Sequence, residues 1–525
     1  MLIKCFGAAP QGIEAAIITI EVHAVPGFEF TLVGLPDSAV KESHERIIAA
    51  LTVNGYNKPR HTLTINMAPA DIKKEGASYD LPLAIGILAA EEEVQTKLLG
   101  QYLIMGELSL DGSLQPIQGV LPIAMAAHSA GFKGIILPQQ NAREAAVVEQ
   151  LEVYGMTNLR EVIQFLNGTQ AFTPIHVDTL SEFQMHAFSA ELDFSDVRGQ
   201  ENVRRAMEVA AAGGHNMLMV GPPGAGKSMM AKRLPSILPP LTLDEALETT
   251  KIYSVSGMMM RKKDSNGMAS ALIVQRPFRS PHHTITDVAL VGGGTNPQPG
   301  EISLAHNGVL FLDELPEYKR SALEVMRQPL EDRHICITRA KMRVDYPASF
   351  MLVAAMNPCP CGHYGENNSA HPCTCTPAQI HRYMSRISGP LLDRIDIQCD
   401  IQPVPYSMLK DAKPSESSAA IRERVIQARA IQQQRFALYN QKAKTPIHCN
   451  AQMTPKLVRT YCILDAQGDK LLAYSMEKLG LSARAYDRIL KVARTIADLA
   501  GATDIGATHL MEAISYRNLD RSDWA

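Results

Sequence analysis

Residues 217–228 read Met-Leu-Met-Val-Gly-Pro-Pro-Gly-Ala-Gly-Lys-Ser, an apolar run followed by a glycine-rich loop that ends in Lys-Ser. Glycines let successive backbone N–H groups turn inward and cradle a phosphate, and the positive end of a following helix helps to hold the anion. In this pattern Lys227 reaches the β and γ phosphates and Ser228 ligates Mg²⁺. The predicted phosphate-binding loop, between a strand and a helix, consists of Gly221, Pro222, Pro223, Gly224, Ala225, Gly226, Lys227 and Ser228.

A second apolar run, at residues 309–312, ends in two carboxylates, Asp313 and Glu314. A buried strand with this ending places Asp313 on the magnesium shell and lets Glu314 polarise the attacking water. A glycine-rich turn alone can arise by chance, but the two motifs in this order support each other. The chain is therefore predicted to bind ATP with Mg²⁺ and to hydrolyse it.

Composition limits the remaining possibilities. A chain of 525 residues is expected to form about three domains. The net charge of −3 argues against a uniformly basic surface, so any nucleic-acid contact must be local. Neither a secretory signal pattern nor a run of about 18 apolar residues is found, so we expect a cytoplasmic protein with no membrane partner. Nine cysteines, with four in one loop, indicate reduced thiols and a metal site.

The pattern of apolar residues predicts an α/β fold with a helical C-terminal part. Strands and helices alternate both in the first part of the chain and around the phosphate-binding loop, whereas apolar spacing becomes helical near the C-terminus, most clearly over 481–499. The predicted units are an α/β domain over 1–172, a linker over 173–195, a P-loop α/β domain over 196–402, a hinge over 403–418 and a helical lid over 419–525.

Three polar residues outside the two motifs are candidates for catalysis. Asn357 follows the apolar strand 350–356 and is expected to position the lytic water, with an ordinary strand-end Asn before Pro358 as the alternative. Arg394 ends a short helix and is the candidate arginine finger that neutralises charge on the γ phosphate from across a subunit boundary, with Arg386 as the second candidate. A single arginine is more often a surface residue.

Arg484 lies at the start of the helix predicted near the C-terminus. There it is expected to contact the γ phosphate and couple the nucleotide state to lid closure. Arg488 lies four residues on, on the same helix face. The alternative is that both arginines form salt bridges with Asp487 or other nearby acids.

Taken together, four segments resemble the ComM/YifB family of magnesium-chelatase-like AAA+ ATPases: 193–233, 313–314, 356–362 and 391–394. The resemblance covers nearly the whole chain. It implies a homo-oligomeric ring, expected to be a hexamer because a neighbour must provide the finger arginine. Residues 276–283 fit the helix-2 insert that the resemblance implies.

Four cysteines form two closely spaced pairs in one loop: Cys359, Cys361, Cys373 and Cys375. Four thiolates on two short arms can close a tetrahedral site, so we predict a structural Zn²⁺. A mixed Cys/His site and simple reduced thiols are the alternatives, since C-x-C pairs are less typical of zinc than C-x-x-C pairs. A metal here would stiffen the connection between Asn357 and the candidate finger.

Two segments of the first domain, 73–83 and 107–138, resemble the Lon-protease-like domain with a ribosomal S5-type fold. The match places Ser78 at the nucleophile and Gln115 at the partner lysine. Since a neutral amide cannot act as the base, proteolysis is not expected, although Lys73 or Lys74 is a conceivable substitute. Ser78 is also explained as a helix N-cap. The domain is expected to serve ring assembly or DNA contact.

Residues 333–344 alternate around a short turn, which predicts a β-hairpin. In related DNA motors such a hairpin projects into the central pore, where Arg339, Lys341 and Arg343 would meet phosphates. A charged hairpin on an outer surface is the alternative of equal weight. Residues 261–263, Arg-Lys-Lys, provide a second basic candidate.

The leading hypothesis is an ATP-driven DNA motor, for which the family resemblance implies branch migration of recombination intermediates during uptake of transforming DNA. The alternative is a motor that drives a protein partner, like the ATPase subunit of magnesium chelatase. An ATP-dependent protease would need the base that Gln115 does not supply.

Overall fold

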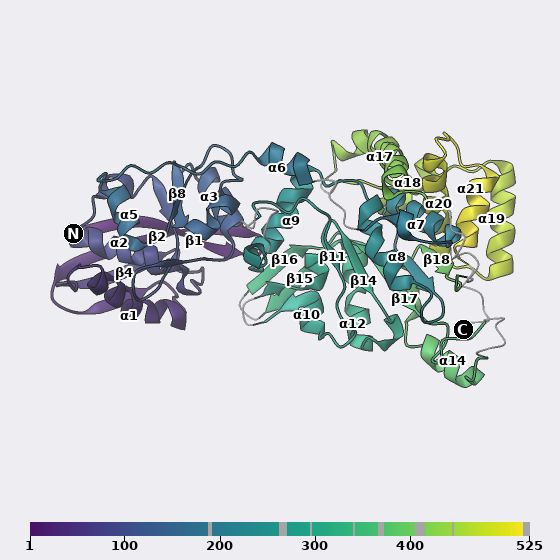
Figure 1. Ribbon diagram of the computed structural model, residues 1–525, viewed down its shortest axis with the longest axis horizontal. Coiled ribbons are helices and arrows are strands. Elements are labelled where there is room, and N and C mark those ends of the chain that lie inside the picture. The colour runs from purple at the N-terminus through teal and green to yellow at the C-terminus, as the bar shows by residue number, and fades with distance from the viewer. Residues whose placement is uncertain are drawn as a thin grey trace.

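The computed structural model describes residues 1–186, 192–261, 270–294, 297–339, 342–365, 372–404, 415–443 and 446–517. The molecule is elongated: an α/β domain occupies one end, a P-loop domain the middle, and a group of helices the other end (Figure 1). Within the described residues no helix has the length and apolar character needed to cross a membrane. The predicted α/β class with a C-terminal helical part is confirmed.

The first domain contains a four-stranded sheet of order β1-β2-β4-β3 and a parallel three-stranded sheet of order β5-β8-β9. Helices α2 and α3 pack on β1 and β2, so apolar side chains from both elements share one core. Its strands are β1 (Leu2–Gln11), β2 (Glu14–Pro26), β3 (Phe30–Val33), β4 (His61–Ala68), β5 (Tyr102–Ile104), β6 (Glu107–Leu108), β7 (Leu114–Gln115), β8 (Gly134–Pro138) and β9 (Glu152–Met156), and its helices are α1 (Ser38–Val53), α2 (Asp80–Ala90), α3 (Val120–Ser129), α4 (Ala142–Ala145) and α5 (Leu159–Leu166).

The stretch expected to be a linker, 173–195, is partly folded onto the first domain. Helix α6 (Thr179–His186) lies within it, and Ile175 bridges to Val153 of β9. Phe172, Ile175 and Val177 pack against the domain core. The described part of this connection is therefore packed structure, because its apolar side chains find a surface to cover.

The P-loop domain is built on a five-stranded sheet of order β11-β14-β17-β10-β18, in which every pair is parallel. The central strands are apolar throughout because helices cover both faces of a parallel sheet. Its strands are β10 (Met217–Val220), β11 (Phe278–Arg279), β12 (Gly292–Gly293), β13 (Gln298–Pro299), β14 (Val309–Leu312), β15 (His334–Arg339), β16 (Met342–Pro347), β17 (Met351–Met356) and β18 (Ile397–Asp400), and its helices are α7 (Glu201–Gly213), α8 (Lys227–Arg233), α9 (Leu243–Val255), α10 (Asp287–Val291), α11 (Glu301–Leu304), α12 (Arg320–Val325), α13 (Arg327–Asp332), α14 (Pro377–Met384) and α15 (Gly389–Leu392).

The C-terminal helices pack on α7 at one side of the sheet (Figure 1). A buried polar cluster joins the two parts: His215 Nδ1 lies 3.2 Å from Asp396 Oδ2, and its Nε2 lies 2.8 Å from Thr495 Oγ1. The helices are α17 (Ser418–Asn440), α18 (Pro455–Tyr461), α19 (Ala466–Leu479), α20 (Ala483–Leu499) and α21 (Ala507–Ser515). Helix α20 matches the helical spacing predicted over 481–499.

The first domain is docked on the P-loop domain through α3 and α9. The backbone N–H of Gly119 donates to Ser254 O (3.1 Å), and the N–H of Leu121 donates to Glu144 Oε1 (3.0 Å) and Ser254 Oγ (3.3 Å). Around these bonds lies an apolar cluster drawn from both domains: Leu121, Val147, Leu241, Ala246, Ala271 and Leu272. Burial raises the pKa of Glu144 to about 7, so this interface contains a carboxyl group that ionises reluctantly.

Replacing Glu144 by Gln tests the docking interface. The folded-state pKa of about 7 lies above the ordinary value of 4.5. The wild-type protein therefore loses stability as pH rises from 4.5 to about 7, because the buried carboxyl group is then forced to ionise. A neutral Gln removes that penalty. We expect Glu144→Gln to stabilise the protein relative to wild type by about 1 kcal/mol or more at pH 8 and by less at pH 5.5, measured by thermal unfolding. The exposed Glu149→Gln is the matched control, and an equal shift at both pH values contradicts the prediction.

Candidate nucleotide-binding site

The predicted phosphate-binding loop follows β10 and leads into α8, as expected from its sequence. Gly224 (φ +78°) and Gly226 (φ +92°) adopt backbone conformations that favour glycine, and Gly226 is the N-cap of α8. The N-terminus of α8 therefore faces the loop, where its dipole favours an anion.

Lys227 lies at the centre of the site. Its Nζ donates to the carbonyl oxygens of Gly221 (2.6 Å) and Pro222 (2.8 Å) and to Asn357 Oδ1 (3.0 Å). Desolvation lowers the pKa of Lys227, although the charges of Asp313 and Glu314 oppose that shift. The ammonium group is thus held inside the loop, where a phosphate would meet it.

The carboxylates predicted after the second apolar run also reach the loop. Ser228 Oγ donates to Asp313 Oδ2 at 2.5 Å, so the two predicted magnesium ligands are adjacent. Glu314 follows in a left-handed conformation (φ +52°), which is uncommon for a residue with a side chain. Its Oε2 lies 3.2 Å from Nδ1 of His283. His283 is the last residue of the segment 276–283, for which the sequence predicted no catalytic role.

Parallel strands explain why these residues meet. β10, β14 and β17 are neighbours in the sheet, and the phosphate-binding loop, Asp313 and Asn357 each follow the carboxyl end of one strand. Such an edge is where ligands bind in open α/β sheets. The structure therefore brings together the groups needed to hold a nucleotide phosphate and Mg²⁺. The catalytic roles assigned to Glu314 and Asn357 stay predictions.

Arg394, the candidate finger, is bound within its own chain. Only 6% of its surface is exposed. Its guanidinium pairs with Glu331 and donates to the carbonyl oxygens of Arg327 (3.2 Å) and Pro390 (2.5 Å). To reach a neighbouring subunit it would have to leave these partners. Arg386, the second candidate, is half exposed and lies 2.9 Å from Glu317.

Arg484 and Arg488 of α20 face the segment that follows α15. Arg484 Nη1 lies 3.5 Å from Asp393 Oδ2, and Arg488 pairs with the buried Asp396. Burial disfavours the charged Asp396, but Arg488 and His215 hold the pKa of that carboxyl well below its usual range. Both arginines therefore form salt bridges, as the alternative held, but with Asp393 and Asp396 instead of Asp487. These two pairs tie the helical part to the P-loop domain.

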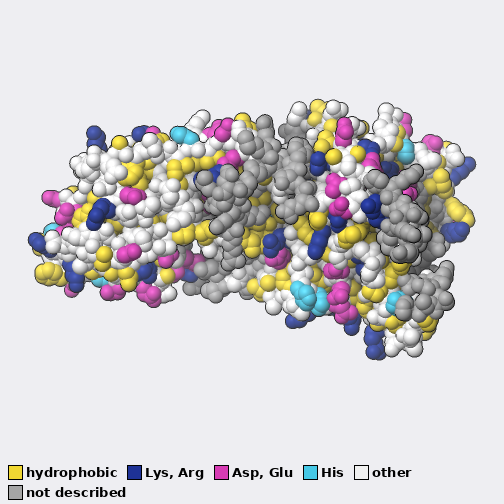
Figure 2. All heavy atoms as spheres, in the orientation of Figure 1, with side chains coloured by type: hydrophobic (Ala, Val, Ile, Leu, Met, Phe, Trp, Pro, Cys, Tyr) yellow, Lys and Arg dark blue, Asp and Glu magenta, His cyan; other side chains and the backbone are white. Residues whose placement is uncertain are grey.

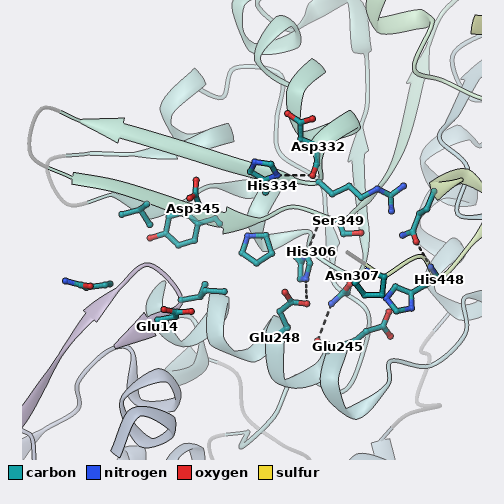
Figure 3. A pocket seen from close by; sticks show the side chains of 18 of the residues that line it. Glu14, Glu245, Glu248, His306, Asn307, Asp332, His334, Asp345, Ser349 and His448 are labelled. Atoms are coloured by element: carbon teal, nitrogen blue, oxygen red, sulfur yellow. Dashed lines mark hydrogen bonds and ion pairs between the residues drawn. The ribbon is translucent and has the colours of Figure 1, made fainter. Parts of the chain in front are cut away.

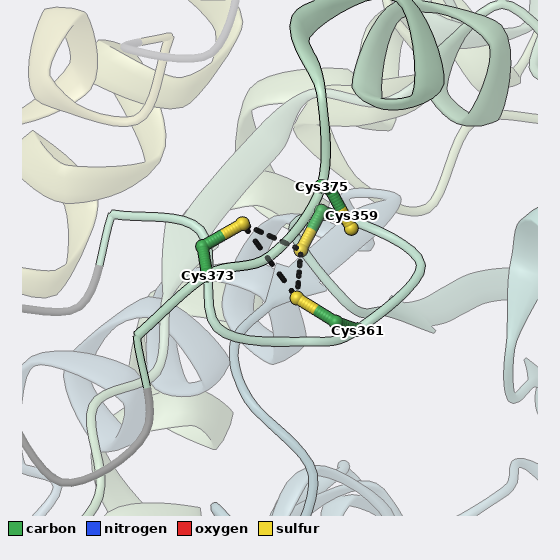
Figure 4. A group of neighbouring side chains, drawn as sticks. All are labelled: Cys359, Cys361, Cys373 and Cys375. Carbon is green, nitrogen blue, oxygen red and sulfur yellow. Dashed lines mark hydrogen bonds between the residues drawn. The ribbon is translucent and has the colours of Figure 1, made fainter.

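The four cysteines converge in space, as predicted. Their sulfur atoms all lie within 4.8 Å of one another (Figure 4). Cys359 Sγ lies 3.3 Å from Cys361 Sγ and 3.8 Å from Cys373 Sγ, and Cys361 Sγ lies 3.6 Å from Cys373 Sγ. Tetrahedral Zn²⁺ with Zn–S bonds of about 2.3 Å separates its sulfurs by about 3.8 Å. The geometry of the four sulfurs fits zinc.

Two thiols of the cluster ionise at very different pH values. The backbone N–H of His363 lowers the pKa of Cys361 to about 5. The Cys375 N–H favours the Cys373 thiolate, yet burial and the neighbouring sulfurs raise the pKa of Cys373 to about 12. Four thiolates so close together would need a positive charge among them, which a bound zinc ion would supply.

The cysteine loop packs against the phosphate-binding loop. Gly362 has φ +89°, and a Cβ atom at this position would lie 2.6 Å from Cδ of Pro223. Only glycine satisfies both the backbone conformation and the close approach. The cysteine cluster therefore supports the wall of the nucleotide site.

The predicted hairpin is formed by β15 and β16, which pair antiparallel from His334↔Pro347 to Arg339↔Met342. Ile335, Ile337, Val344 and Tyr346 form its buried face. Arg343 is exposed on the other face, 3.7 Å from Asp345. Of the other DNA-contact candidates, Lys341 and the side chain of Arg339 lie outside the described residues, as do Lys262 and Lys263. DNA contact by the hairpin stays a prediction.

A cavity of about 770 Å³ lies at the root of this hairpin, apart from the nucleotide loop (Figure 3). In it His306 Nε2 lies 3.0 Å from Glu248 Oε2, and its Nδ1 accepts the N–H of Ser349. Segments from three parts of the protein meet there: the β1–β2 turn of the first domain, several segments of the P-loop domain and the start of the C-terminal part. Its lining includes Gln11, Ile13, Glu14, Glu245, Glu248, His306, His334, Arg343, Val344, Asp345, Tyr346, Pro446, His448 and Gln452. The first domain thus adjoins the hairpin.

Ser78 lies in a second cavity, of about 370 Å³, between the first domain and the hairpin. The expected N-cap role is wrong: Ser78 is inside the short 3-10 helix η1 (Ala77–Tyr79), and Tyr79 is the N-cap of α2. Gln115 points elsewhere, since its amide donates to Ser109 Oγ at 2.9 Å. Gln118 and Lys73 line this cavity instead, and Lys73 pairs with Glu75.

The strand order, the phosphate-binding loop and the carboxylate pair at the sheet edge define a P-loop protein of the AAA+ class, as the comparisons with known proteins bear out. Family models match three segments: "Magnesium chelatase, subunit ChlI" over residues 193–409, "Subunit ChlI of Mg-chelatase" over 20–141, and "Magnesium chelatase, subunit ChlI C-terminal" over 415–517.

Among its relatives, competence protein ComM of Haemophilus influenzae is 43% identical, over 98% of this chain and 97% of the relative. The YifB protein of Salmonella typhimurium is 44% identical, over 98% of this chain and 96% of the relative. The chain belongs to the ComM/YifB family of magnesium-chelatase-like AAA+ proteins. Lon protease 2 of Bacillus subtilis is 28% identical over 28% of this chain and 26% of its own length, a likeness in the N-terminal region.

Replacing Asn357 by Ala tests the hydrogen bond to Lys227. Loss of a polar group that acts on the reacting phosphate or water lowers the rate of chemistry more than binding. We expect kcat for ATP hydrolysis to fall about tenfold or more while the Kd for ATP changes little. Lys227→Ala, the comparison variant, is expected to lose both ATP hydrolysis and ATP binding. An unchanged kcat in Asn357→Ala contradicts the role assigned to this residue.

Proposed function

We propose that this protein is an ATP-hydrolysing AAA+ ring motor that acts on DNA and remodels recombination intermediates, including their branch migration. The observation that carries the proposal is the packing that joins the nucleotide site to the hairpin. Leu310 and Leu312 of β14, the strand that Asp313 follows, belong to the same buried cluster as Ile337 and Val344 of the hairpin. A change at the nucleotide can therefore move the hairpin through close-packed side chains.

The family supports DNA as the substrate of this motor. ComM of Haemophilus influenzae, a relative over nearly the full length, is described as a competence protein. Competence concerns the uptake of DNA, so a motor of the same family is proposed to act on incoming or branched strands. On the face shown in Figure 2 basic and acidic side chains are mixed, so contact with DNA is expected to be local.

For catalysis the proposal assigns a role to each group at the sheet edge. Lys227 binds the β and γ phosphates, Ser228 and Asp313 ligate Mg²⁺, Glu314 polarises the attacking water, and Asn357 positions that water. These roles rest on the contacts among the side chains described above. The Mg²⁺ ion would supply charge neutralisation on the phosphates.

The proposed assembly is a homo-hexameric ring, as AAA+ proteins commonly form rings. Arg394 is the finger predicted from sequence, and the half-exposed Arg386, paired with Glu317, is the second candidate. Arg484, 64% exposed on α20, is proposed to contact the γ phosphate and to couple the nucleotide state to lid closure. In the cysteine loop, Cys359, Cys361, Cys373 and Cys375 are proposed to hold a structural Zn²⁺.

A second candidate function is a motor that drives a protein partner. It is favoured by the family models, which carry the description of a magnesium chelatase subunit. It shares the nucleotide chemistry and differs in what the ring acts on.

The substrate is tested by ATP hydrolysis with single-stranded, duplex and four-way-junction DNA. We expect junction DNA to stimulate the wild-type protein and to have no effect on Lys227→Ala. Arg343→Ala is expected to weaken DNA binding and to reduce the slope of log K against log salt by about one, as loss of a phosphate contact does. Arg459→Ala, an exposed arginine on α18, is the control. Hydrolysis indifferent to every DNA, with no salt-dependent binding, would favour the protein-partner motor.

Metal analysis tests the cysteine site. Native protein is expected to contain about one zinc per chain, and Cys373→Ser is expected to lower that content and the rate of ATP hydrolysis, because the loop packs on Pro223. Cys336→Ser, on the hairpin, is the control. If Cys373→Ser does not fold, the site is tested in the native wild-type protein. Blocking its thiols is expected to release zinc. Absence of zinc, or equal content in both variants, contradicts the site.

A further inference from the structure

A small recess lies at the edge of the sheet opposite the candidate nucleotide site. It has a volume of about 90 Å³ and opens into the larger cavity at the root of the hairpin, since Asn307, Ser349 and His448 line both (Figure 3). Asn307 and Ser349 precede β14 and β17, the strands whose other ends lead to Asp313 and Asn357. The recess therefore lies between the amino ends of these strands and the C-terminal part, to which His448 belongs.

Three guanidinium groups line this recess, those of Arg276, Arg333 and Arg429. Among the described residues that line it, Glu245 alone carries a carboxylate. Glu245 Oε2 lies 3.1 Å from Arg276 Nη2, and Arg276 also donates to three backbone carbonyl oxygens. The carboxylate of Glu245 thus balances one of the three positive charges, and the donors of Arg276 are used within the chain.

The charges of the other two arginines are not balanced in this way. Arg429 Nη2 donates to the carbonyl oxygen of Ala211, at 2.9 Å, and Arg333 bonds to the thiol of Cys449. These partners are uncharged groups of the protein. Asp396, whose charge also acts on Arg333, is already paired with α20. In the part of the chain that the structure describes, no salt bridge joins Arg333 or Arg429 to a carboxylate.

Two unbalanced positive charges in a partly buried recess are unfavourable. Burial lowers the pKa of Arg333, and the charge of Arg429 lowers it further. Burial and the neighbouring arginines also lower the pKa of His448, so its ring adds no positive charge at neutral pH. A guanidinium group cannot lose its proton in a protein. Because a buried charge without a partner costs stability, an anion in the recess would stabilise the protein.

The size and surroundings of the recess select the class of anion. Its volume of about 90 Å³ suits one tetrahedral oxyanion but is too small for a nucleotide. The planar fork of a guanidinium group matches two oxygen atoms of a phosphate. Outside the recess, the wall of the larger cavity carries more carboxylates than arginines, and like charges there would repel the further phosphates of a polyanion. These outer groups are Glu14, Glu248, Asp332 and Asp345, against Arg343.

We propose that the recess binds a single phosphate group, as inorganic phosphate or as a small phosphomonoester, between Arg333 and Arg429. Arg333 follows α13 of the P-loop domain, whereas Arg429 lies on α17. A bound phosphate therefore joins the C-terminal helices to the edge of the sheet farthest from ATP. The site is separate from the phosphate-binding loop, and it does not depend on DNA as the substrate of the motor.

Calorimetric titration of the whole protein with inorganic phosphate tests the site. A saturating non-hydrolysable ATP analogue with Mg²⁺ keeps the phosphate-binding loop filled, and chloride holds the ionic strength constant. We expect wild type to bind phosphate with a Kd of about 1 mM or tighter. Arg333→Gln is expected to weaken binding about tenfold or more, and Arg333→Lys by less, because it keeps the charge. Arg459→Gln, exposed on α18, is the control and should match wild type.

Thermal unfolding with the same ATP analogue gives a readout that a purely structural arginine would not produce. Without phosphate, Arg333→Gln is expected to unfold at a higher temperature than wild type, because an unbalanced buried charge has been removed. Added phosphate is expected to raise the midpoint of wild type, since it binds the folded state, and to leave that of Arg333→Gln unchanged.

Absence of phosphate binding by wild type would overturn the proposal, as would equal binding by Arg333→Gln. Glycerol 3-phosphate, titrated in parallel, separates the two sources of the phosphate group. Tighter binding than that of inorganic phosphate assigns the site to a phosphomonoester, and equal or weaker binding assigns it to the free ion. Displacement of phosphate by short duplex DNA would make a nucleic-acid backbone the occupant and would overturn the assignment to a single phosphate.

A carboxylate from a second copy of the chain is the remaining source of negative charge. In that case Arg333→Gln would weaken the assembly of the ring, measured by sedimentation, while phosphate would affect neither protein. That result would overturn the proposal as well.

Discussion

The parallel pairing of β10, β14 and β17 is the constraint on which the nucleotide site depends. Parallel strands end at one edge, and each of these three ends in a different chemical group: the phosphate-binding loop, a carboxylate pair and an amide. Lys227 connects two of them, because its ammonium group bonds to loop carbonyls and to Asn357. The strands can pair in this way only because their side chains are apolar on both faces, so the same residues that form the core also align the site.

Around this edge lie elements that connect the nucleotide site to other parts of the chain. The cysteine loop contacts Pro223, the insert contacts Glu314 through His283, and α20 contacts the segment after α15 through Arg484 and Arg488. Each is a long-range contact made by a loop or helix end. Loops at the edge of a rigid sheet can move without disturbing the core, which suits a site that has to change with its ligand.

The sequence predicted what depends on local pattern. Strand ends followed by polar residues located the loop, Asp313 and Asn357, and helical spacing located α20. It did not predict the contact of His283 with Glu314, because that contact requires β11 to pair with β14, a pairing that no local pattern encodes. The burial of Arg394 and the interface at Glu144 were missed for the same reason. Ser78 was taken for an N-cap because a serine before an apolar run has that pattern, whereas the N-cap of α2 is Tyr79, which makes no side-chain cap hydrogen bond.

The β1–β2 turn of the first domain limits how members of this family can be engineered or can evolve. A Cβ atom on Gly12 would lie 2.8 Å from Cγ1 of Val344, so the turn and the hairpin fit each other to within a methyl group. The two residues belong to different domains and lie far apart in the chain, yet a larger side chain at either position would require a change at the other. A chimaera that takes its first domain from one relative and its P-loop domain from another would combine surfaces with separate histories. The hairpin would have to be transplanted together with the domain that lies against it.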